Sequence, residues 1–245
     1  MLSNFALPIT ACVIGASGGI GGALVQRLAA DPGVGVVHAG ARGAASGGVD
    51  GDPKVKPFRI DLTDEASIAD AAAHIGACEL VIIATGMLHD ANFQPEKSYR
   101  GQTADGYARA FAINTIGPAL IGKHFLPLLP RDRRSVFAAL SARVSSVSDN
   151  RLGGWHAYRA AKAALNMVLR NFAVELGRTH KEVVIAGLHP GTVDTPLSQP
   201  FQRNVDPAKL FTADYAAQQL LSVIDGLTPR DSGNLFAWDG QRIDF

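Results

Sequence analysis

Residues 9–30, ITACVIGASGGIGGALVQRLAA, join an apolar run to a glycine-rich turn and then to a helical pattern. The run 9–15 is short and contains β-branched residues, which is typical of a β-strand. After the turn, Ile20, Leu24 and Leu28 recur at helical spacing, which predicts a helix with an apolar face. We therefore expect a strand, a glycine-rich turn and a helix in direct succession.

The glycines of this turn suit the binding of a phosphate. Glycine lets backbone N–H groups approach a ligand closely, and the N-terminus of the following helix favours negative charge. A glycine-rich turn between a first strand and a first helix is where dinucleotide-binding folds hold the pyrophosphate. The glycines fit both GxxxGxG (15, 19, 21) and GxxGxxG (15, 18, 21), and the spacing does not separate them. The cofactor residues expected here are Gly15, Ser17, Gly18, Gly19, Ile20 and Gly21.

Residues 34–86 repeat the alternation of strand and helix. We expect a second strand at 34–39 and an edge strand at 55–61, because Pro57 cannot donate to a ladder. A helix should begin at Asp61-Leu62, and 79–86 is apolar enough for a central parallel strand. The predicted fold is α/β: a single-domain, Rossmann-type, doubly wound parallel sheet of about seven strands, with helices on both faces, over residues 1–245.

The composition excludes several functional classes. The chain has 245 residues, 47% of them hydrophobic, and a formal net charge of +1. That balance gives no electrostatic footprint for nucleic acid, and no apolar stretch approaches the length of a membrane span. Cys12 and Cys78 lie in or beside apolar runs and are expected to be buried thiols. We expect a cytoplasmic protein without a metal site, in which Arg131, Arg133 and Arg134 form a solvated loop.

Arg42 follows the second expected strand and bears on cofactor choice. An acidic residue near this point would hydrogen-bond the ribose 2′-hydroxyl of NAD, whereas an Arg accommodates the 2′-phosphate of NADP. The segment has no acid before Asp50. The sequence therefore favours NADP(H), with NAD(H) as the alternative.

Residues 156–166, HAYRAAKAALN, place Tyr158 and Lys162 four residues apart in a segment that favours a helix. That spacing puts both side chains on one face, one turn apart. An ammonium group favours the phenolate, so we expect Lys162 to lower the pKa of Tyr158 from its usual ~10. A phenol tuned in this way can act as an acid or base; the alternative is an ordinary helix with both side chains in solvent.

Asn114 interrupts the apolar run of a helix expected from Asp105 onward, and Gly117-Pro118 would weaken or kink that helix. Asn114 is either an accommodated polar residue or one that holds a water or backbone group near the active site. Residues 87–104 are irregular and polar, and we expect them to form a loop beside the site.

Taken together, these residues resemble the short-chain dehydrogenase/reductase family over nearly the whole chain. The family's glycine motif is matched by Gly15, Gly19, Ile20 and Gly21. Its later motifs are matched by Asn114, Tyr158, Lys162 and Pro190-Gly191. Ala84-Thr85-Gly86 stands where the family has Asn-Ala-Gly. Residues 141–167, 188–202 and 232–245 resemble more narrowly the C-factor branch, which is similar to sniffer-type carbonyl reductases.

The resemblance implies a nicotinamide cofactor that passes hydride to a substrate carbonyl while Tyr158 donates a proton. Lys162 would reach the nicotinamide ribose, and Asn114 would anchor a water that returns protons to it. Residues 87–104 and 194–210 would form the walls and lid of a pocket for a small-molecule carbonyl or alcohol. The remaining cofactor residues implied are Asp61 and Leu62 at the adenine, Ala84, Thr85 and Gly86 along the adenosine ribose, and Pro190, Gly191 and Val193 over the nicotinamide.

One catalytic residue of the family has several candidates in this chain. The family Ser usually lies thirteen positions before the Tyr, which is Ser145. A longer loop would put the Ser position at 142, which is Ala here, and Ser141 and Ser146 are then candidates too. We take Ser145 as the prediction, with a hydroxyl that holds the carbonyl oxygen where its charge grows.

Three functions remain open at this point. The first is an NADP(H)-dependent carbonyl reductase or alcohol dehydrogenase, which the Tyr158/Lys162 pair favours. The second is a cofactor-binding signalling module of C-factor type with little turnover, which the altered 84–86 segment favours slightly. The third, an extended relative acting on nucleotide sugars, is opposed by the few residues left after the strand at 183–188. Family members commonly pair through helices near 105–126 and 156–177, so we expect a homodimer or homotetramer.

Overall fold

The computed structural model describes residues 2–43, 47–91 and 93–245. Within them an eight-stranded sheet runs in the order β10-β9-β6-β5-β4-β1-β2-β3, and all neighbours are parallel except β9 and β10. This confirms the Rossmann-type parallel sheet, with β3 at its edge as Pro57 predicts. The strands are β1 (Ile9–Ile14), β2 (Val34–Ala41), β3 (Val55–Arg59), β4 (Leu80–Ile83), β5 (Ser135–Leu140), β6 (Val183–His189), β9 (Asn234–Ala237) and β10 (Arg242–Ile243).

Three very short strands go beyond the expected seven. β10 adds an antiparallel edge to the sheet, and β7 (Thr192–Val193) pairs with β8 (Leu210–Phe211) in a separate two-stranded sheet. Each of the three has two residues, which is too short for an alternating apolar pattern to show in the sequence.

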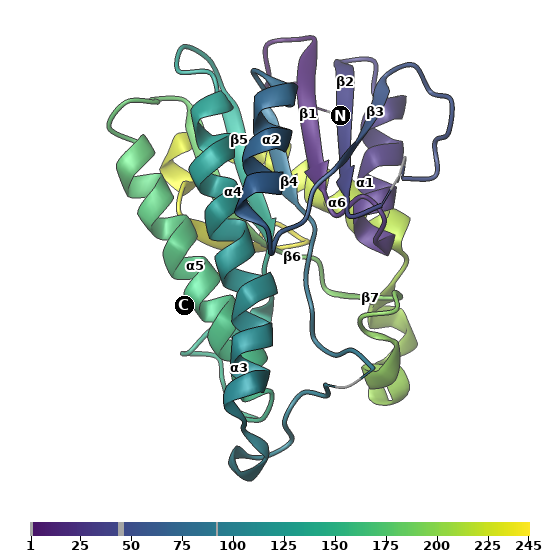
Figure 1. Cartoon of the computed structure of the whole chain (residues 1–245), viewed down its shortest axis with the longest axis vertical. Coiled ribbons are helices and arrows are strands. Elements are labelled where there is room, and N and C mark those ends of the chain that lie inside the picture. The colour runs from purple at the N-terminus through teal and green to yellow at the C-terminus, as the bar shows by residue number, and fades with distance from the viewer. Residues whose placement is uncertain (1, 44–46, 92) are drawn as a thin grey trace.

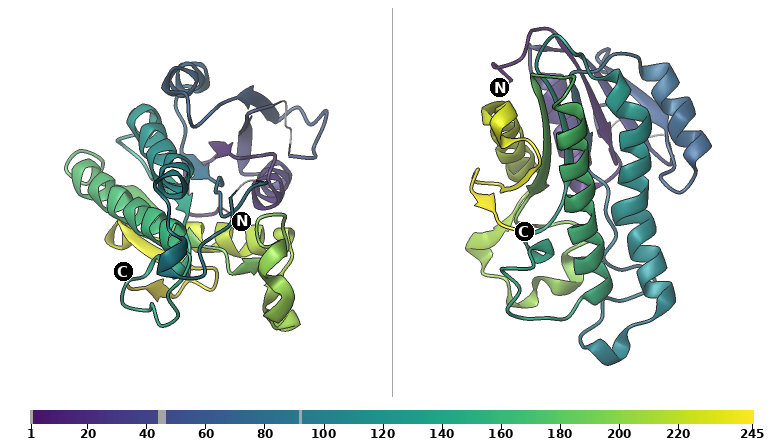
Figure 2. Two further views of the ribbon diagram at one scale, coloured as in Figure 1. Left: turned by 60° about the horizontal axis from the view of Figure 1, so that its bottom comes forward. Right: turned by 90° about the vertical axis from the view of Figure 1, so that its left-hand side faces the viewer.

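Helices cover both faces of the sheet, as Figure 2 shows. Leu24 of α1 and Leu220 of α6 share a core with Val13, while Phe125 of α4 and Leu165 of α5 share the opposite core with the next strand residue, Ile14. Alternate strand residues thus serve the two cores in turn. The helices are α1 (Gly19–Ala30), α2 (Glu65–Ile75), α3 (Ala104–Phe111), α4 (Gly117–Phe125), α5 (His156–Leu176) and α6 (Ala213–Gly226).

One helix boundary differs from expectation, and one helix is interrupted beside Gly117-Pro118, where weakening or a kink was expected. α2 begins at Glu65 rather than at Asp61, because the Asp61 carboxylate instead accepts from the Thr63 N–H and hydroxyl, and Asp64 supplies the N-cap. The helix from 104 to 125 is interrupted by a π-helical turn over 112–116. Pro118 has no N–H to donate to the carbonyl one turn earlier, which is consistent with the wider turn.

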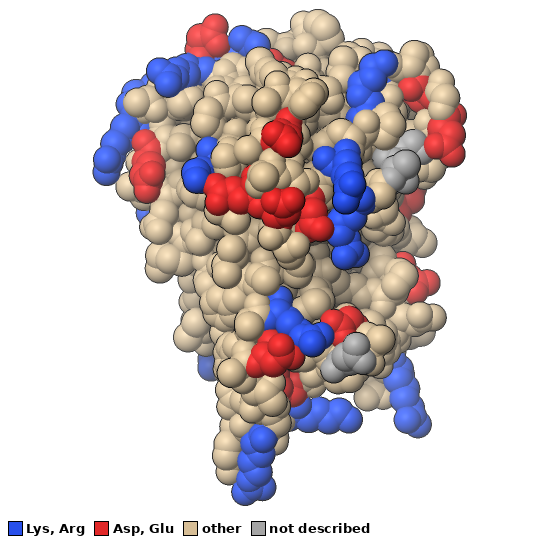
Figure 3. Space-filling view, in the orientation of Figure 1, with Lys and Arg blue, Asp and Glu red and all other residues tan. Residues whose placement is uncertain are grey.

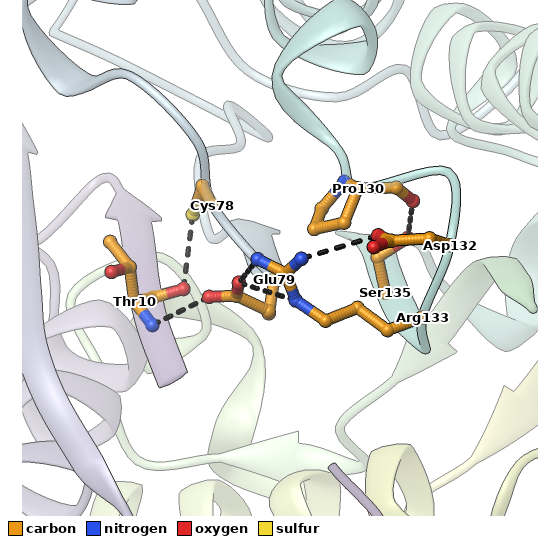
Figure 4. A network of polar contacts seen from close by, with 7 residues as sticks. All are labelled: Thr10, Cys78, Glu79, Pro130, Asp132, Arg133 and Ser135. Carbon is orange, nitrogen blue, oxygen red and sulfur yellow. Dashed lines mark hydrogen bonds and ion pairs between the residues drawn. The ribbon is translucent and has the colours of Figure 1, made fainter. Parts of the chain in front are cut away.

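A buried carboxylate ties three strands together at the amino end of the sheet (Figure 4). Glu79 is only 6% exposed; it accepts the Thr10 N–H at 2.8 Å and the Arg133 guanidinium at 2.7 Å. Arg134 donates to the carbonyls of Ile224 and Asp225. Residues 131–134 form a loop with Arg131 exposed, as expected. Arg133 and Arg134 correct the expectation of a purely solvated cluster, because they bind groups that are distant in sequence.

Both cysteines are buried free thiols, as expected. Burial raises the pKa of Cys78 to about 12 and raises that of Cys12 as well. Among the described residues, no helix combines the length and apolar character needed to cross a bilayer, and no three potential ligand side chains are placed to hold a metal ion.

The strands end where the candidate site begins. β1 points toward the lower half of Figure 1, where α3 and the segment after β7 extend beyond the sheet. Basic and acidic side chains occur close together on the face drawn in Figure 3, and neither sign covers it. Ligands of open α/β sheets bind outside the carboxyl ends of the strands, so this end is where the predicted residues should meet.

Candidate functional site

The glycine-rich turn between β1 and α1 packs tightly on the end of β4. Gly15 has φ +103°, and a Cβ there would lie 2.9 Å from the Ala84 carbonyl carbon. A Cβ on Gly21 would collide with the Gly15 carbonyl, and one on Gly19 would lie 2.8 Å from Thr195 Cγ2. A Cβ on Gly18 would lie 3.4 Å from its nearest neighbour, the Gly15 carbonyl oxygen, which is an ordinary contact distance. The tightest packing thus falls on 15, 19 and 21, which favours the GxxxGxG spacing.

A groove of about 540 Å³ opens between this turn and the ends of β2 and β4. Arg42 and Asp61 both line it. Hydrogen bonds from Thr63 hold the pKa of Asp61 below its usual value, and the charges of Arg42 and Arg59 lower it further. Of the residues predicted to bind the cofactor, the groove is lined by Gly15, Ser17, Gly18, Arg42, Asp61, Leu62, Ala84, Thr85 and Gly86.

Gly86 connects this groove to the residues predicted to be catalytic. A Cβ at Gly86 would lie 3.5 Å from Asn114 Oδ1 and 3.6 Å from Lys162 Nζ. Asn114 lies in the π-helical turn, fully buried, and its amide accepts from the Met87 N–H at 3.0 Å and donates to the Met87 carbonyl at 2.8 Å. Asn114 thus fixes the chain as it leaves the groove, one of the two roles left open for it.

Tyr158 and Lys162 lie on the buried face of α5, so the exposed alternative is wrong. Lys162 Nζ is 5.9 Å from the centroid of the Tyr158 ring and donates to the Leu140 carbonyl at 2.8 Å. Burial raises the pKa of Tyr158 to about 12 and lowers that of Lys162 to about 7. The expected lowering of the Tyr158 pKa is therefore wrong, because burial disfavours both charged forms and leaves Lys162 only partly protonated near neutral pH.

The candidate serines lie just beyond β5, and two of them bind Asn166. Ser145 Oγ donates to the Ala142 carbonyl at 2.6 Å and accepts from Asn166 Nδ2 at 2.8 Å. Ser141 Oγ donates to Asn166 Oδ1 at 2.8 Å, while Ser146 Oγ pairs with Ser148. Contact of Ser145 with a substrate oxygen stays a prediction. Asn166 continues the spacing of Tyr158 and Lys162 by four residues, a signal that sequence reasoning missed.

Segments after β4 and β6 meet over the site. His89 Nε2 lies 3.2 Å from the carbonyls of both Pro196 and Leu197. The Phe201 ring contacts His89 at 5.7 Å and Trp155 at 5.0 Å between ring centroids. These contacts bring together parts of the stretches 87–104 and 194–210, as expected. His89 had no sequence signal of its own, since its partners are main-chain carbonyls about a hundred residues away.

The chain between β6 and α6, residues 190–212, forms the segment that covers the site, and we call it the covering segment. Gly191 has φ +79°, and a Cβ there would lie 2.6 Å from the Phe211 ring, so this turn requires glycine. Val193 is buried and pairs with Phe211 in the β7–β8 sheet. Whether Pro190, Gly191 and Val193 cover a nicotinamide stays a prediction.

Comparison with known protein sequences relates the chain to oxidoreductases. A sequence model described as short chain dehydrogenase matches residues 9–206. The 1-hydroxy-2-glutathionyl-2-methyl-3-butene dehydrogenase of Rhodococcus sp. (strain AD45) is 32% identical over 94% of this chain and 97% of that protein. C-signal of Myxococcus xanthus is 37% identical over 56% of this chain and 76% of that protein.

Solved structures share the fold. The NADPH-bound carbonyl reductase from chicken fatty liver matches with a TM-score of 0.81 at 23% identity, over 99% of this chain and 97% of that one. The carbonyl reductase Sniffer of D. melanogaster matches with a TM-score of 0.82 at 18% identity, over 98% and 100% of the two chains. With the family match over residues 9–206 and a relative 32% identical along nearly its whole length, the chain belongs to the short-chain dehydrogenase family of oxidoreductases.

Proposed function

We propose that this protein interconverts a small-molecule carbonyl and its alcohol by hydride transfer with NADP(H), and that Tyr158 donates the proton during reduction. The observation that carries the proposal is the position of Gly86. It lines the same groove as Arg42, and a Cβ at Gly86 would lie 3.6 Å from Lys162 Nζ. A dinucleotide along this groove would bring its reactive end toward the buried Tyr158/Lys162 face of α5.

The groove residues fit a phosphorylated dinucleotide. The turn at Gly15 exposes backbone at the N-terminus of α1, where a phosphate is favoured. Thr85 lines the groove, and its buried Oγ1 has no hydrogen-bond partner among the described residues, which leaves it able to bond a ligand group that reaches it. Arg42 supplies a cation for a 2′-phosphate at the groove's edge. The cofactor, when bound, supplies the hydride.

Tyr158 is suited to giving a proton. Burial raises the pKa of Tyr158, so the phenol keeps its proton at neutral pH, and the protonated phenol is the form that reduction of a carbonyl requires. Lys162, with a pKa near 7, exchanges protons readily in the same range and can return one to the site. The reverse reaction, oxidation of the alcohol, needs the phenolate, so its rate should increase as the pH rises.

A signalling module with little turnover is not favoured. The altered 84–86 segment and the uncertain position of the family Ser favour it slightly, and the likeness to C-signal covers only 56% of the chain. The Rhodococcus relative, named a dehydrogenase, matches 94% of the chain.

A substrate screen tests the proposal. Aldehydes, ketones and alcohols would be offered with each cofactor, and the nicotinamide absorbance followed. We expect turnover with at least one carbonyl and NADPH, above the rate of cofactor without substrate. Tight NADPH binding with no turnover across the screen would contradict the enzymatic function and leave the binding module.

A further inference from the structure

The chain takes a left-handed path immediately before the helix that carries Tyr158. Gly153, Gly154 and Trp155 have φ of 64°, 67° and 50°, and Trp155 is the one non-glycine residue with positive φ in the described parts of the chain. A bulky side chain disfavours this conformation, so surrounding contacts must hold it. The strain lies three residues before Tyr158.

The contacts that hold Trp155 come from two other segments. Its N–H donates to the Glu96 carbonyl at 2.6 Å. Its indole packs edge-on against Tyr158, with ring centroids 6.3 Å apart, and against Phe201 of the covering segment. The backbone of residue 96 therefore fixes the conformation that aims the indole at Tyr158.

The Glu96 side chain acts on the same turn. Trp155 gives α5 no side-chain cap, which leaves the N–H groups of the first turn without intrahelical partners. The N–H of Ala157 donates to Glu96 Oε2 at 3.3 Å. A carboxylate at a helix N-terminus is favoured by the helix dipole, and uncapped first turns fray. Tyr158 is the next residue, within that turn.

The Glu96 carboxylate is buried, and within the described parts of the chain one of its oxygens is unpaired, which costs free energy of folding. Its side chain is only 6% exposed, and Oε1 has no hydrogen-bond partner among the described residues. An unpaired buried carboxylate oxygen is unfavourable, so the burial of this side chain calls for a compensating role. Glu96 lies in the connection between β4 and α3. The same connection lines the groove at Met87.

We infer that Glu96 is a positioning residue for Tyr158. Its carboxylate caps the first turn of α5 from the β4–α3 connection, and its main-chain carbonyl holds Trp155 in the left-handed conformation. Together the two contacts set where the phenol lies relative to the groove. The inference rests on the proposed function, since it assigns Glu96 to the orientation of the proton donor.

Glu96→Ala and Glu96→Gln test the inference, with Glu79→Ala and Glu79→Gln as controls. Glu79 is equally buried and also accepts a backbone N–H, but at the opposite end of the sheet. Because small displacements at a reacting centre lower rates steeply, we expect kcat to fall about tenfold or more in Glu96→Ala, with the Kd of NADPH nearly unchanged. Glu96→Gln, which keeps an oxygen for Ala157, should lie between wild type and Glu96→Ala.

A kcat of Glu96→Ala that stays near wild type, or that falls no further than in Glu79→Ala, would overturn the inference. If Glu96→Ala does not fold, Glu96→Gln is compared with Glu79→Gln instead. An unchanged kcat in Glu96→Gln overturns the inference, and a drop of about threefold or more at constant NADPH affinity, absent from Glu79→Gln, supports it.

A second readout does not depend on turnover. The chain has two tryptophans, so in a Trp238→Phe background Trp155 is the only one left to emit. The Glu96 main-chain carbonyl remains in both variants, so a shift must come from the loosened first turn of α5. We expect Glu96→Ala to shift the emission to longer wavelength as the indole leaves Phe201, Glu96→Gln to shift it less, and the Glu79 variants to leave it in place. If the wild type shows no turnover, the proposed function fails, and this emission alone decides on Glu96: no shift overturns its positioning role.

Discussion

Lys162 lies one helical turn from Tyr158, yet its ammonium group donates to the Leu140 main-chain carbonyl, and its nitrogen is 5.9 Å from the phenol ring centroid. Both side chains are buried, so their pKa values move in opposite directions, to about 12 for Tyr158 and about 7 for Lys162. The pair is therefore a protonated phenol beside an amine that gains or loses its proton near neutral pH.

Lys162→Met should stabilise the fold in a pH-dependent way. The folded pKa of Lys162 is about 7 against an ordinary 10.5, so burial of the charge destabilises the wild type fully below pH 7. That penalty shrinks as the pH rises toward 10.5, because the folded state has already released the proton. We expect the gain in free energy of unfolding from Lys162→Met, measured by urea denaturation, to be larger at pH 6 than at pH 9. A gain that grows with pH would contradict the assigned pKa shift.

Arg42→Ala should remove most of the preference for NADPH over NADH. A hydrogen bond to a charged phosphate contributes about 1.5–3 kcal/mol, so NADPH affinity should weaken correspondingly while NADH affinity stays nearly constant. Arg59→Ala is a matched control, because Arg59 also acts on Asp61 but does not line the groove. Fluorescence titration with both cofactors measures the effect. Tighter binding of NADH than NADPH by the wild type would refute the NADP assignment.

The sequence predicted the parts of the fold that depend on local pattern. The β1–turn–α1 unit, the edge position of β3 and the shared face of Tyr158 and Lys162 follow from apolar spacing, Pro57 and i,i+4 geometry. The direction of the Tyr158 pKa shift did not follow, because it depends on how deeply α5 is buried rather than on the nearby ammonium.

Contacts between distant segments were also beyond the sequence. Glu96 reaches Ala157 across 61 positions, and His89 reaches Leu197 across 108. Neither residue belongs to a motif, and each binds main-chain groups that any residue type can offer. The Asn166 link to the two serines likewise appears only once β5 and α5 are packed together.

His89→Ala should speed the release of bound cofactor. His89 joins the wall of the groove to the carbonyls of Pro196 and Leu197, so its loss should let the covering segment open more often. We expect the dissociation rate of NADPH, measured by stopped-flow displacement, to rise several-fold with little change in its association rate. His74→Ala is the control, since His74 contacts only a carbonyl of its own helix among the bonds described. An unchanged dissociation rate would show that the contact of His89 with the Pro196 and Leu197 carbonyls does not hold the covering segment closed.

Self-association is expected through α4 and α5. Ile116, Met167 and Val174 are 51%, 62% and 50% exposed on this part of the molecule, which leaves apolar surface in need of cover. Light scattering at micromolar concentration should give the mass of a dimer or tetramer, and Met167→Lys should lower it. Leu152→Lys, at a residue 91% exposed in the loop before α5, should not. A monomer mass for the wild type would refute the prediction.

The role of Tyr158 is the centre of the account, and Tyr158→Phe tests it most directly. The ring remains to pack against Trp155, and only the hydroxyl that gives the proton is lost. Tyr107→Phe removes a hydroxyl on α3 that is bonded to Gln102, and it serves as the control with activity retained. On a substrate found in the screen, we predict that Tyr158→Phe abolishes turnover while the Kd of NADPH stays within a few-fold of wild type. Wild-type turnover in Tyr158→Phe would contradict the account.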